Sequence, residues 1–274
     1  MNRQINRRQI NRIDKTFKIL RARREAALIP YVMAGDPSLE KTGELVIEMA
    51  QQGADIIELG VPFSDPIADG PTIQRASQRA LKDKASLSRI LLLVADLRKR
   101  TQVPIVLMTY YNPVFKFGEE RFVEEAIASG VDGLIIPDLP PEEGHTLISY
   151  SKRFNLDTIF LLAPTSTKER IKKIASASSG FIYYVSITGI TGARLDDIQE
   201  VKGRIDEIRG NTTKPISVGF GISDPEQAAN IARFADGVVV VSAIINKIEA
   251  MAGDPDLIKM VGEFVQLLKK GMVP

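Results

Sequence analysis

The chain has 274 residues, 44% of them hydrophobic and 26% charged, and its formal net charge is +2 at pH 7. Such a chain can form one large barrel or two ordinary domains, and its composition is typical of a soluble globular protein. The absence of cysteine excludes a disulfide framework, a thiol nucleophile and a thiolate metal site. A single histidine, His145, cannot build a multi-histidine metal centre, so acid–base chemistry falls largely to carboxylates.

The first 24 residues are strongly basic, with nine lysines and arginines against one acidic residue, Asp14. Within them Ile10, Ile13, Phe17 and Leu20 fall on one helical face. This pattern predicts a helix packed across the bottom of the fold. An organelle transit peptide and a nucleic-acid-binding arm are the alternatives, but a purely electrostatic arm needs no apolar stripe. No apolar run approaches the roughly 20 residues that span a membrane.

Short apolar runs alternate with helical patterns along the rest of the chain. We expect strands at residues 28–33, 56–60, 105–109, 133–136, 158–162, 181–185, 216–218 and 237–241. Eight strands alternating with helices predict an α/β fold, a (β/α)₈ TIM barrel, rather than an open doubly wound sheet. The long interval after the second strand leaves room for an additional helix near residues 72–82.

No linker rich in proline, glycine and serine divides the chain. We therefore expect one barrel domain over residues 1–274, with residues 1–24 as a basic N-terminal extension that includes the extra helix.

An acidic residue, Glu58, interrupts the second predicted strand. Because side chains alternate along a strand, Ile56, Glu58 and Gly60 share one face, and Glu58 is expected to point into the fold interior. Burial should raise its pKa toward neutrality, which suits a general acid and base. The alternative is a buried carboxylate satisfied by a neighbouring cation.

The carboxyl ends of barrel strands are where catalytic groups gather. Asp65 and Asp69 follow the second strand directly, and no predicted strand end presents a lysine for Schiff-base chemistry. A carbon–carbon cleavage would therefore use proton transfer by Glu58 and Asp69. Apolar side chains near the same rim predict a flat pocket, although ordinary packing is the favoured reading for Met108 and Leu161. The expected pocket residues are Tyr31, Met108, Tyr110, Leu161, Tyr183 and Phe220.

Glycines cluster after the last three strands, at Gly189, Gly192, Gly219 and Gly221, and Ser242 follows the eighth. Loops at these positions, with the start of a short helix, commonly bind phosphate through backbone N–H groups. The pattern predicts a phosphate site whose last helix begins near Ser242. Tight turns between strand and helix would explain any one of these glycines alone.

Six segments together resemble the tryptophan synthase alpha chain, in order and at matching spacing from about Leu28 to the C-terminus. They read LIPYVMAGDP (28–37), ELGVPFSDPIADGP (58–71), GVDGLIIPDLP (130–140), LAPTS (162–166), ITGITGAR (187–194) and VGFGIS (218–223). The resemblance implies a (β/α)₈ barrel that cleaves indole-3-glycerol phosphate to indole and glyceraldehyde 3-phosphate in a retro-aldol reaction.

The resemblance also implies roles for individual residues. Glu58 matches the group that protonates indole C3 and handles the glycerol hydroxyl proton, and Asp69 matches the carboxylate that holds the indole N–H. Thr191 matches a lid residue that pairs with the Asp69 loop on closure. The matching phosphate-binding positions are Gly192, Gly221, Val241 and Ser242.

Two residues depart from the family pattern. Val241 stands where glycine is usual, and Ile187 stands where many members carry a polar or basic residue. Valine resists positive φ and crowds a close approach, so we expect weaker phosphate binding or a slightly displaced loop.

The family's partner is a beta chain that holds pyridoxal phosphate and joins indole to serine, in a cytoplasmic αββα heterotetramer. The resemblance implies that indole passes to that partner, that this chain needs no cofactor or metal, and that it binds no nucleic acid or membrane. Asp65, Asn112 and Pro140 match positions that face the beta chain.

Two other functions are compatible with parts of the sequence. A non-catalytic subunit that only activates a beta chain is suggested by Val241. A different phosphosugar barrel, such as an isomerase, is disfavoured because Glu58, Asp69 and the whole PFSDPIADGP loop are present.

Overall fold

The computed structural model describes residues 10–186, 195–219 and 221–273. Their strands pair in parallel in the order β5-β4-β3-β2-β1-β9-β8-β7-β6. The strands are β1 (Ala27–Met33), β2 (Ile57–Gly60), β3 (Ile105–Met108), β4 (Gly133–Ile135), β5 (Asp157–Ile159), β6 (Leu161–Leu162), β7 (Ile182–Val185), β8 (Ile216–Gly219) and β9 (Gly237–Val240).

The predicted fifth strand is present as two segments, β5 and β6, on either side of Phe160. β5 pairs with β4, and β6 pairs with β7, so this interrupted strand joins the two ends of the sheet. The amide of Phe160 donates to Ser178 Oγ at 3.3 Å, outside the strand ladder. The wall is therefore a barrel built from the eight predicted strands, and the predicted fold class is confirmed.

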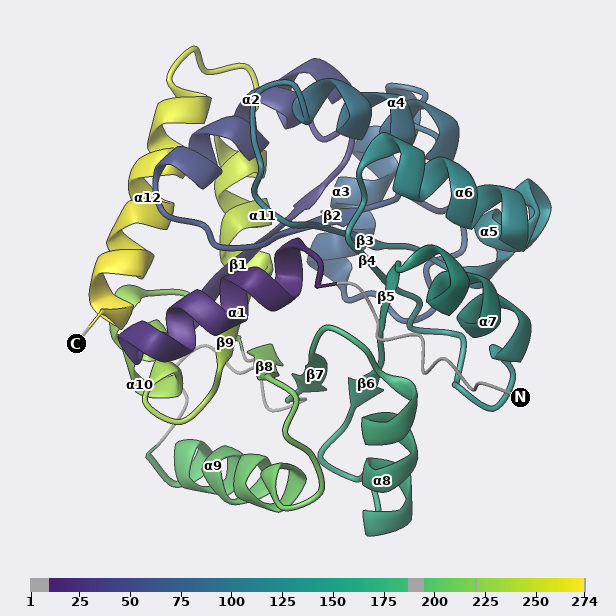
Figure 1. The fold of residues 1–274 in the computed structure, drawn as a ribbon. Coiled ribbons are helices and arrows are strands. Elements are labelled where there is room, and N and C mark those ends of the chain that lie inside the picture. The colour runs from purple at the N-terminus through teal and green to yellow at the C-terminus, as the bar shows by residue number, and fades with distance from the viewer. Residues whose placement is uncertain (1–9, 187–194, 220, 274) are drawn as a thin grey trace.

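Helices surround the strands, as Figure 1 shows, and none in the described part of the chain combines the length and apolarity of a membrane-spanning helix. The helix expected after the second strand is α3, which precedes α4. The helices are α1 (Arg12–Arg23), α2 (Leu39–Gln51), α3 (Pro71–Lys82), α4 (Leu87–Leu97), α5 (Tyr111–Phe117), α6 (Glu119–Ser129), α7 (His145–Phe154), α8 (Lys168–Ala177), α9 (Leu195–Arg209), α10 (Pro225–Ala232), α11 (Ser242–Ala250) and α12 (Leu257–Met272).

Helix α1, purple in Figure 1, lies across the amino end of the barrel. Asn11 caps it by accepting from the Asp14 amide at 3.0 Å. Ile13, Phe17 and Leu20 are buried in the barrel interior, where the Phe17 and Phe181 rings lie 5.7 Å apart. The predicted apolar stripe is thus confirmed for these three residues.

Ile10, which we placed on the same stripe, precedes the helix and is 60% exposed. It therefore takes no part in the packing of α1 against the barrel.

Strand alternation sorts the core into two parts. Ile57 and Leu59 face outward and pack with the surrounding helices, whereas Ile56 packs inside the barrel with residues of α1. Glu58 belongs to the inward set and is 1% exposed. The alternation predicted from sequence is therefore what carries an acidic group into the barrel.

Candidate active site

Glu58 lies near the carboxyl end of β2, beside Tyr31 of the neighbouring strand. Neither of its carboxyl oxygens has a hydrogen-bond partner within the described residues. Burial alone raises the pKa of Glu58 from 4.5 to about 8. The alternative of a carboxylate satisfied by a neighbouring cation is therefore wrong for this part of the chain, and the group is mainly a neutral acid at pH 7.

Asp69 lies in the loop between β2 and α3 and is partly exposed. Burial raises its pKa from 3.8 to about 6, and a hydrogen bond from Tyr110 opposes that rise. At pH 7 Asp69 is mainly an anion while Glu58 is mainly protonated. Two carboxyl groups held in different protonation states are a common basis for acid–base catalysis.

Tyr110 fixes the loop that carries Asp69. Its hydroxyl accepts a hydrogen bond from the Ala68 amide at 3.0 Å, and its ring lies 5.3 Å from the Phe63 ring. One side chain at the end of β3 therefore contacts the loop at three successive places, Phe63, Ala68 and Asp69.

Tyr31 and Tyr183 are buried inside the barrel, 2% and 5% exposed. The pKa of Tyr31 is raised well above its ordinary value, first by burial and then by the charges of Asp69 and Glu58. The pKa of Tyr183 is likewise raised by burial and by Glu58. Tyr31 thus lies close to both carboxyl groups, and Tyr183 lies close to that of Glu58.

Glycines make room for these two tyrosine rings. A Cβ on Gly60 would lie 2.0 Å from the Tyr31 hydroxyl oxygen, and one on Gly219 would lie 2.8 Å from that of Tyr183. Gly219, grouped above with phosphate-binding residues, therefore serves to accommodate Tyr183. The role of Gly60 was missed, although a glycine at an inward position beside a tyrosine could have indicated it.

Of the remaining predicted pocket residues, two lie in the barrel interior and one lies outside the described residues. Met108 and Leu161 are partly buried and pack against the inner apolar cluster, so they line the interior rather than the helix layer. Phe220 lies outside the described residues, as do Thr191 and Gly192.

At the predicted phosphate site, helix α11 begins at Ser242, as expected. Ser242 and Gly221 are exposed at the carboxyl ends of β9 and β8. Val241 precedes the helix with φ −110° and ψ −78°, which a valine adopts without positive-φ strain. The expected positive-φ strain is therefore absent, and the expected crowding of a bound phosphate by the valine side chain stays a prediction.

The residues expected at a partner surface follow β2, β3 and β4, which are neighbours in the sheet, and Asn112 lies in the first turn of α5. Asp65 and Asn112 are exposed and Pro140 is partly exposed. Two large apolar side chains near them, Ile67 and Phe115, are 84% and 64% exposed. Sequence reasoning missed both, because a single apolar residue in a loop or a short helix carries no signal of its exposure.

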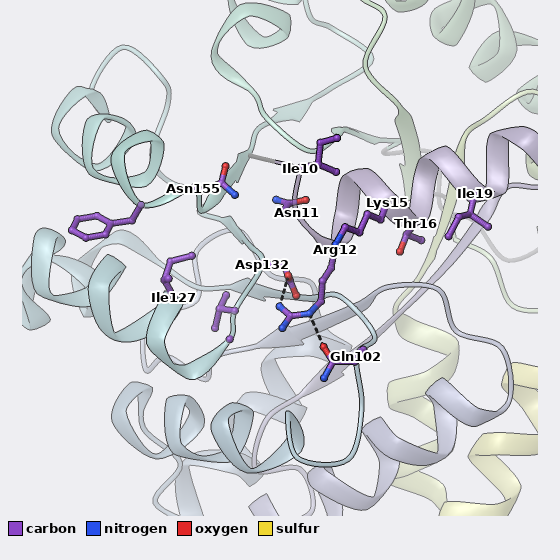
Figure 2. A pocket seen from close by; sticks show the side chains of 13 residues that line it. Ile10, Asn11, Arg12, Lys15, Thr16, Ile19, Gln102, Ile127, Asp132 and Asn155 are labelled. Carbon is purple, nitrogen blue, oxygen red and sulfur yellow. Dashed lines mark hydrogen bonds and ion pairs between the residues drawn. The ribbon is translucent and has the colours of Figure 1, made fainter. Parts of the chain in front are cut away.

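A hollow of about 680 Å³ lies at the opposite, amino end of the barrel, along α1. Figure 2 shows that Arg12 extends across it to Asp132 and Gln102, at 2.9 and 3.1 Å. Gln102 and Asp132 precede β3 and β4. This hollow is therefore far from the carboxyl groups and is not part of the candidate site. His145 is also remote, exposed at the start of α7.

Comparison with known proteins agrees with this geometry. The family model for the tryptophan synthase alpha chain matches residues 17–272. The chain is 51% identical over 263 residues to the tryptophan synthase alpha chain of Geotalea uraniireducens, covering 96% of this chain and 98% of the relative. That of Citrifermentans bemidjiense is 52% identical over 264 residues, with the same coverage of 96% and 98%.

Solved structures are similar as well. Tryptophan synthase subunit alpha from Legionella pneumophila has a TM-score of 0.90 at 39% identity, covering 96% of this chain and 99% of that one. Tryptophan synthase from Mycobacterium tuberculosis gives a TM-score of 0.89 at 35% identity, covering 97% and 100%. The chain therefore belongs to the tryptophan synthase alpha chain family and is a lyase of tryptophan biosynthesis that cleaves indole-3-glycerol phosphate to indole and glyceraldehyde 3-phosphate.

Proposed function

We propose that Glu58 and Asp69 are the catalytic residues of this cleavage, with Glu58 as the general acid and base. The observation that carries the proposal is the buried carboxyl group of Glu58, which has no hydrogen-bond partner within the described residues and a pKa of about 8. A buried acid that stays protonated at neutral pH can give its proton to a carbon atom.

In this mechanism Glu58 gives its proton to C3 of the indole ring, and the ring nitrogen becomes part of a cationic iminium. Asp69, an anion with a pKa of about 6, accepts the N–H hydrogen bond and stabilises that positive charge. The Glu58 carboxylate then takes the proton of the glycerol hydroxyl next to C3. The carbon–carbon bond breaks, its electrons return to the ring, and the hydroxyl carbon becomes an aldehyde.

The substrate's indole would lie between the inward tyrosines and the partly buried side chains of Met108 and Leu161. Tyr31 and Tyr183 are supported as walls of this pocket by their burial and by their electrostatic coupling to Glu58. Tyr110 contributes by holding the Asp69 loop through Ala68. Phe220 and the lid residue Thr191 stay predictions.

The phosphate of the substrate would bind at Gly221, Val241 and Ser242, with Gly192 from the lid segment. The support is the start of α11 at Ser242, because the first N–H groups of a helix lack partners within it and favour an anion. Val241 has a negative φ, so its backbone gives no support to the alternative of a catalytically weak subunit that activates a beta chain.

The roles of the two carboxyl groups are tested by Glu58→Gln and Asp69→Asn. Each should lower indole release by at least about 100-fold, because removal of a general acid or an electrostatic stabiliser typically costs 10²–10⁴. Circular dichroism should show an unchanged fold. Near-normal turnover in either variant would rule out its role.

We also propose that the chain works in the cytoplasm with a beta chain that holds pyridoxal phosphate, in an αββα heterotetramer. The support is the exposed rim formed by Asp65, Asn112 and Pro140 together with the apolar side chains Ile67 and Phe115. Exposed apolar side chains that gather with polar residues on one rim favour a protein interface. Replacement of Ile67 by Asp should weaken complex formation in sedimentation experiments, and an unchanged affinity would argue against this surface.

A further inference from the structure

Helix α3 holds the loop that carries Asp69 at two places. Near the start of the loop, Ser77 Oγ accepts from the Phe63 amide and donates to the Phe63 carbonyl, both at 3.1 Å. At its end, Gln74 Nε2 donates to the Asp69 carbonyl oxygen at 2.8 Å. Ser77 is 1% exposed, so the first contact is shielded from water. The position of the acid loop therefore follows the position of α3.

Two arginines of α3, one turn apart, reach helix α11. Arg75 donates to both carboxylate oxygens of Glu249, with its Nε and Nη2 each at 3.0 Å from an oxygen, and Arg79 Nη1 lies 2.7 Å from Oε1. The hydrogen bond from Arg75 is the main reason that the pKa of Glu249 is lowered, followed by the charges of Arg79 and Arg75. These two charged hydrogen bonds between Arg75 and Glu249 restrain both the distance and the orientation of α3 relative to α11.

Arg79 also connects α3 to the loop after β1. Its Nε and Nη2 donate to the two carboxylate oxygens of Asp36 at 2.8 and 2.7 Å, and Asp36 is 2% exposed. Below these ion pairs Ala76 and Ala80 of α3 pack in one cluster with Ile245 of α11. The two helices are therefore joined by both charge and packing.

We infer that Arg75, Arg79 and Glu249, here called the clamp, are positioning residues that hold the start of α11 at a fixed place relative to Asp69. The inference rests on the proposed function, in which α11 binds the substrate phosphate. Glu249 lies seven residues after Ser242 on one rigid helix, so a shift at the clamp is transmitted to the phosphate end. A misplacement of about 1 Å in a bound substrate can cost up to 100-fold in rate.

The clamp is best broken at Glu249, because removal of Arg79 would leave the buried Asp36 carboxylate unpaired and destabilise the fold. Glu249→Ala should raise both the KM for indole-3-glycerol phosphate and the inhibition constant of inorganic phosphate by at least about fivefold. Glu249→Gln keeps an oxygen acceptor and should fall between this variant and the unmodified chain. Arg75→Met removes a half-exposed partner and should give a smaller shift of about twofold.

A matched control is Glu120→Ala, which breaks a bond between α6 and α7, where Arg153 Nη2 lies 2.7 Å from Glu120 Oε1. It removes an interhelical arginine–glutamate pair of the same kind, remote from α11, so both constants should stay unchanged. All constants are measured on the full-length chain below its melting temperature. A purely structural role for the clamp would lower the melting temperature without moving the phosphate constant.

Ser242→Asp separates this inference from the proposed function. An aspartate at the start of α11 suits the helix dipole but repels phosphate, so it should raise the phosphate constant without unfolding the protein. If Ser242→Asp raises the constant and Glu249→Ala does not, the clamp has no positioning role and the inference is wrong. If neither variant moves it, the phosphate site lies elsewhere and both the inference and that part of the proposed function fall.

Discussion

Buried carboxyl groups at the two ends of the barrel differ in their hydrogen bonding. At the amino end Asp132, 4% exposed, accepts from Arg98 Nη2 at 2.7 Å, Arg12 Nη1 at 2.9 Å and the Ile105 amide at 2.9 Å. At the carboxyl end Glu58, 1% exposed, has no hydrogen-bond partner within the described residues. The two carboxyl groups are thus almost equally buried, but Asp132 accepts three hydrogen bonds and Glu58 accepts none from the described residues.

This difference separates stability from function. A buried carboxylate with three donors ties together the elements that supply them, here α1, the turn after α4, and β3. A buried carboxyl group without donors is costly to ionise, so it retains a proton that it can give to a substrate. Its place beside Asp69 at the carboxyl end of the barrel makes chemistry the better explanation for the unpartnered Glu58 carboxyl group.

The largest expected effect is that variants at the two ends alter different properties, turnover at the carboxyl end and stability at the amino end. Glu58→Gln should lower turnover by about 10²–10⁴-fold without any loss of stability at neutral pH. Asp132→Asn should cost about 3–5 kcal/mol of unfolding free energy, because it leaves the nearly buried Arg98 without its charged partner. Indole release and urea denaturation measure the two quantities. A loss of stability in Glu58→Gln would contradict this contrast between the two ends. A loss of turnover in Asp132→Asn at low temperature would contradict it as well.

The next effect concerns the pH dependence of turnover. Glu58 must be protonated to act as the acid, so kcat/KM should fall as pH rises through about 8. Asp69 must be ionised, so kcat/KM should also fall as pH drops through about 6. The expected profile is a bell with its maximum near pH 7. A rate that keeps rising above pH 9 would contradict the role of Glu58.

Glu58 should also make folding stability depend on pH. Its pKa of about 8 in the folded chain exceeds the ordinary value of 4.5, so between these values the folded state binds more protons than the unfolded state. Stability should therefore fall as pH rises from about 4.5 to about 8, by up to roughly 1.4 kcal/mol per pH unit. Glu58→Gln removes this dependence. The difference in unfolding free energy between the two proteins, measured from pH 5 to pH 8, should grow in favour of the variant.

The smallest expected effect lies at the amino end. Asn11→Ala removes the cap on α1 and the hydrogen bond from Asn11 Nδ2 to Asp157 at 2.6 Å. It should cost about 1–2 kcal/mol of stability and leave kcat/KM unchanged. Thermal melting and the indole assay check this. A change in kcat/KM would mean that the two ends are coupled.

Much of the fold and the identity of the two catalytic candidates could be predicted from the sequence, because both depend on local patterns. Alternation along residues 56–60 is a local property, and it places Glu58 inside once that strand is assigned. The adjacent loop puts Asp69 at the same strand end. The start of α11 at Ser242 followed in the same way from the residues around it.

Only the tertiary structure decided what these groups touch. The break at Phe160, the room that Gly60 leaves for Tyr31, and the link from Arg79 to Asp36 and Glu249 each join residues on different elements. Periodicity carries no information about such pairs, because contacts across the barrel depend on how strands and helices are arranged in space. The two candidate acid–base residues could thus be named in advance, whereas only the assembled structure showed that Glu58 has no hydrogen-bond partner among the described residues.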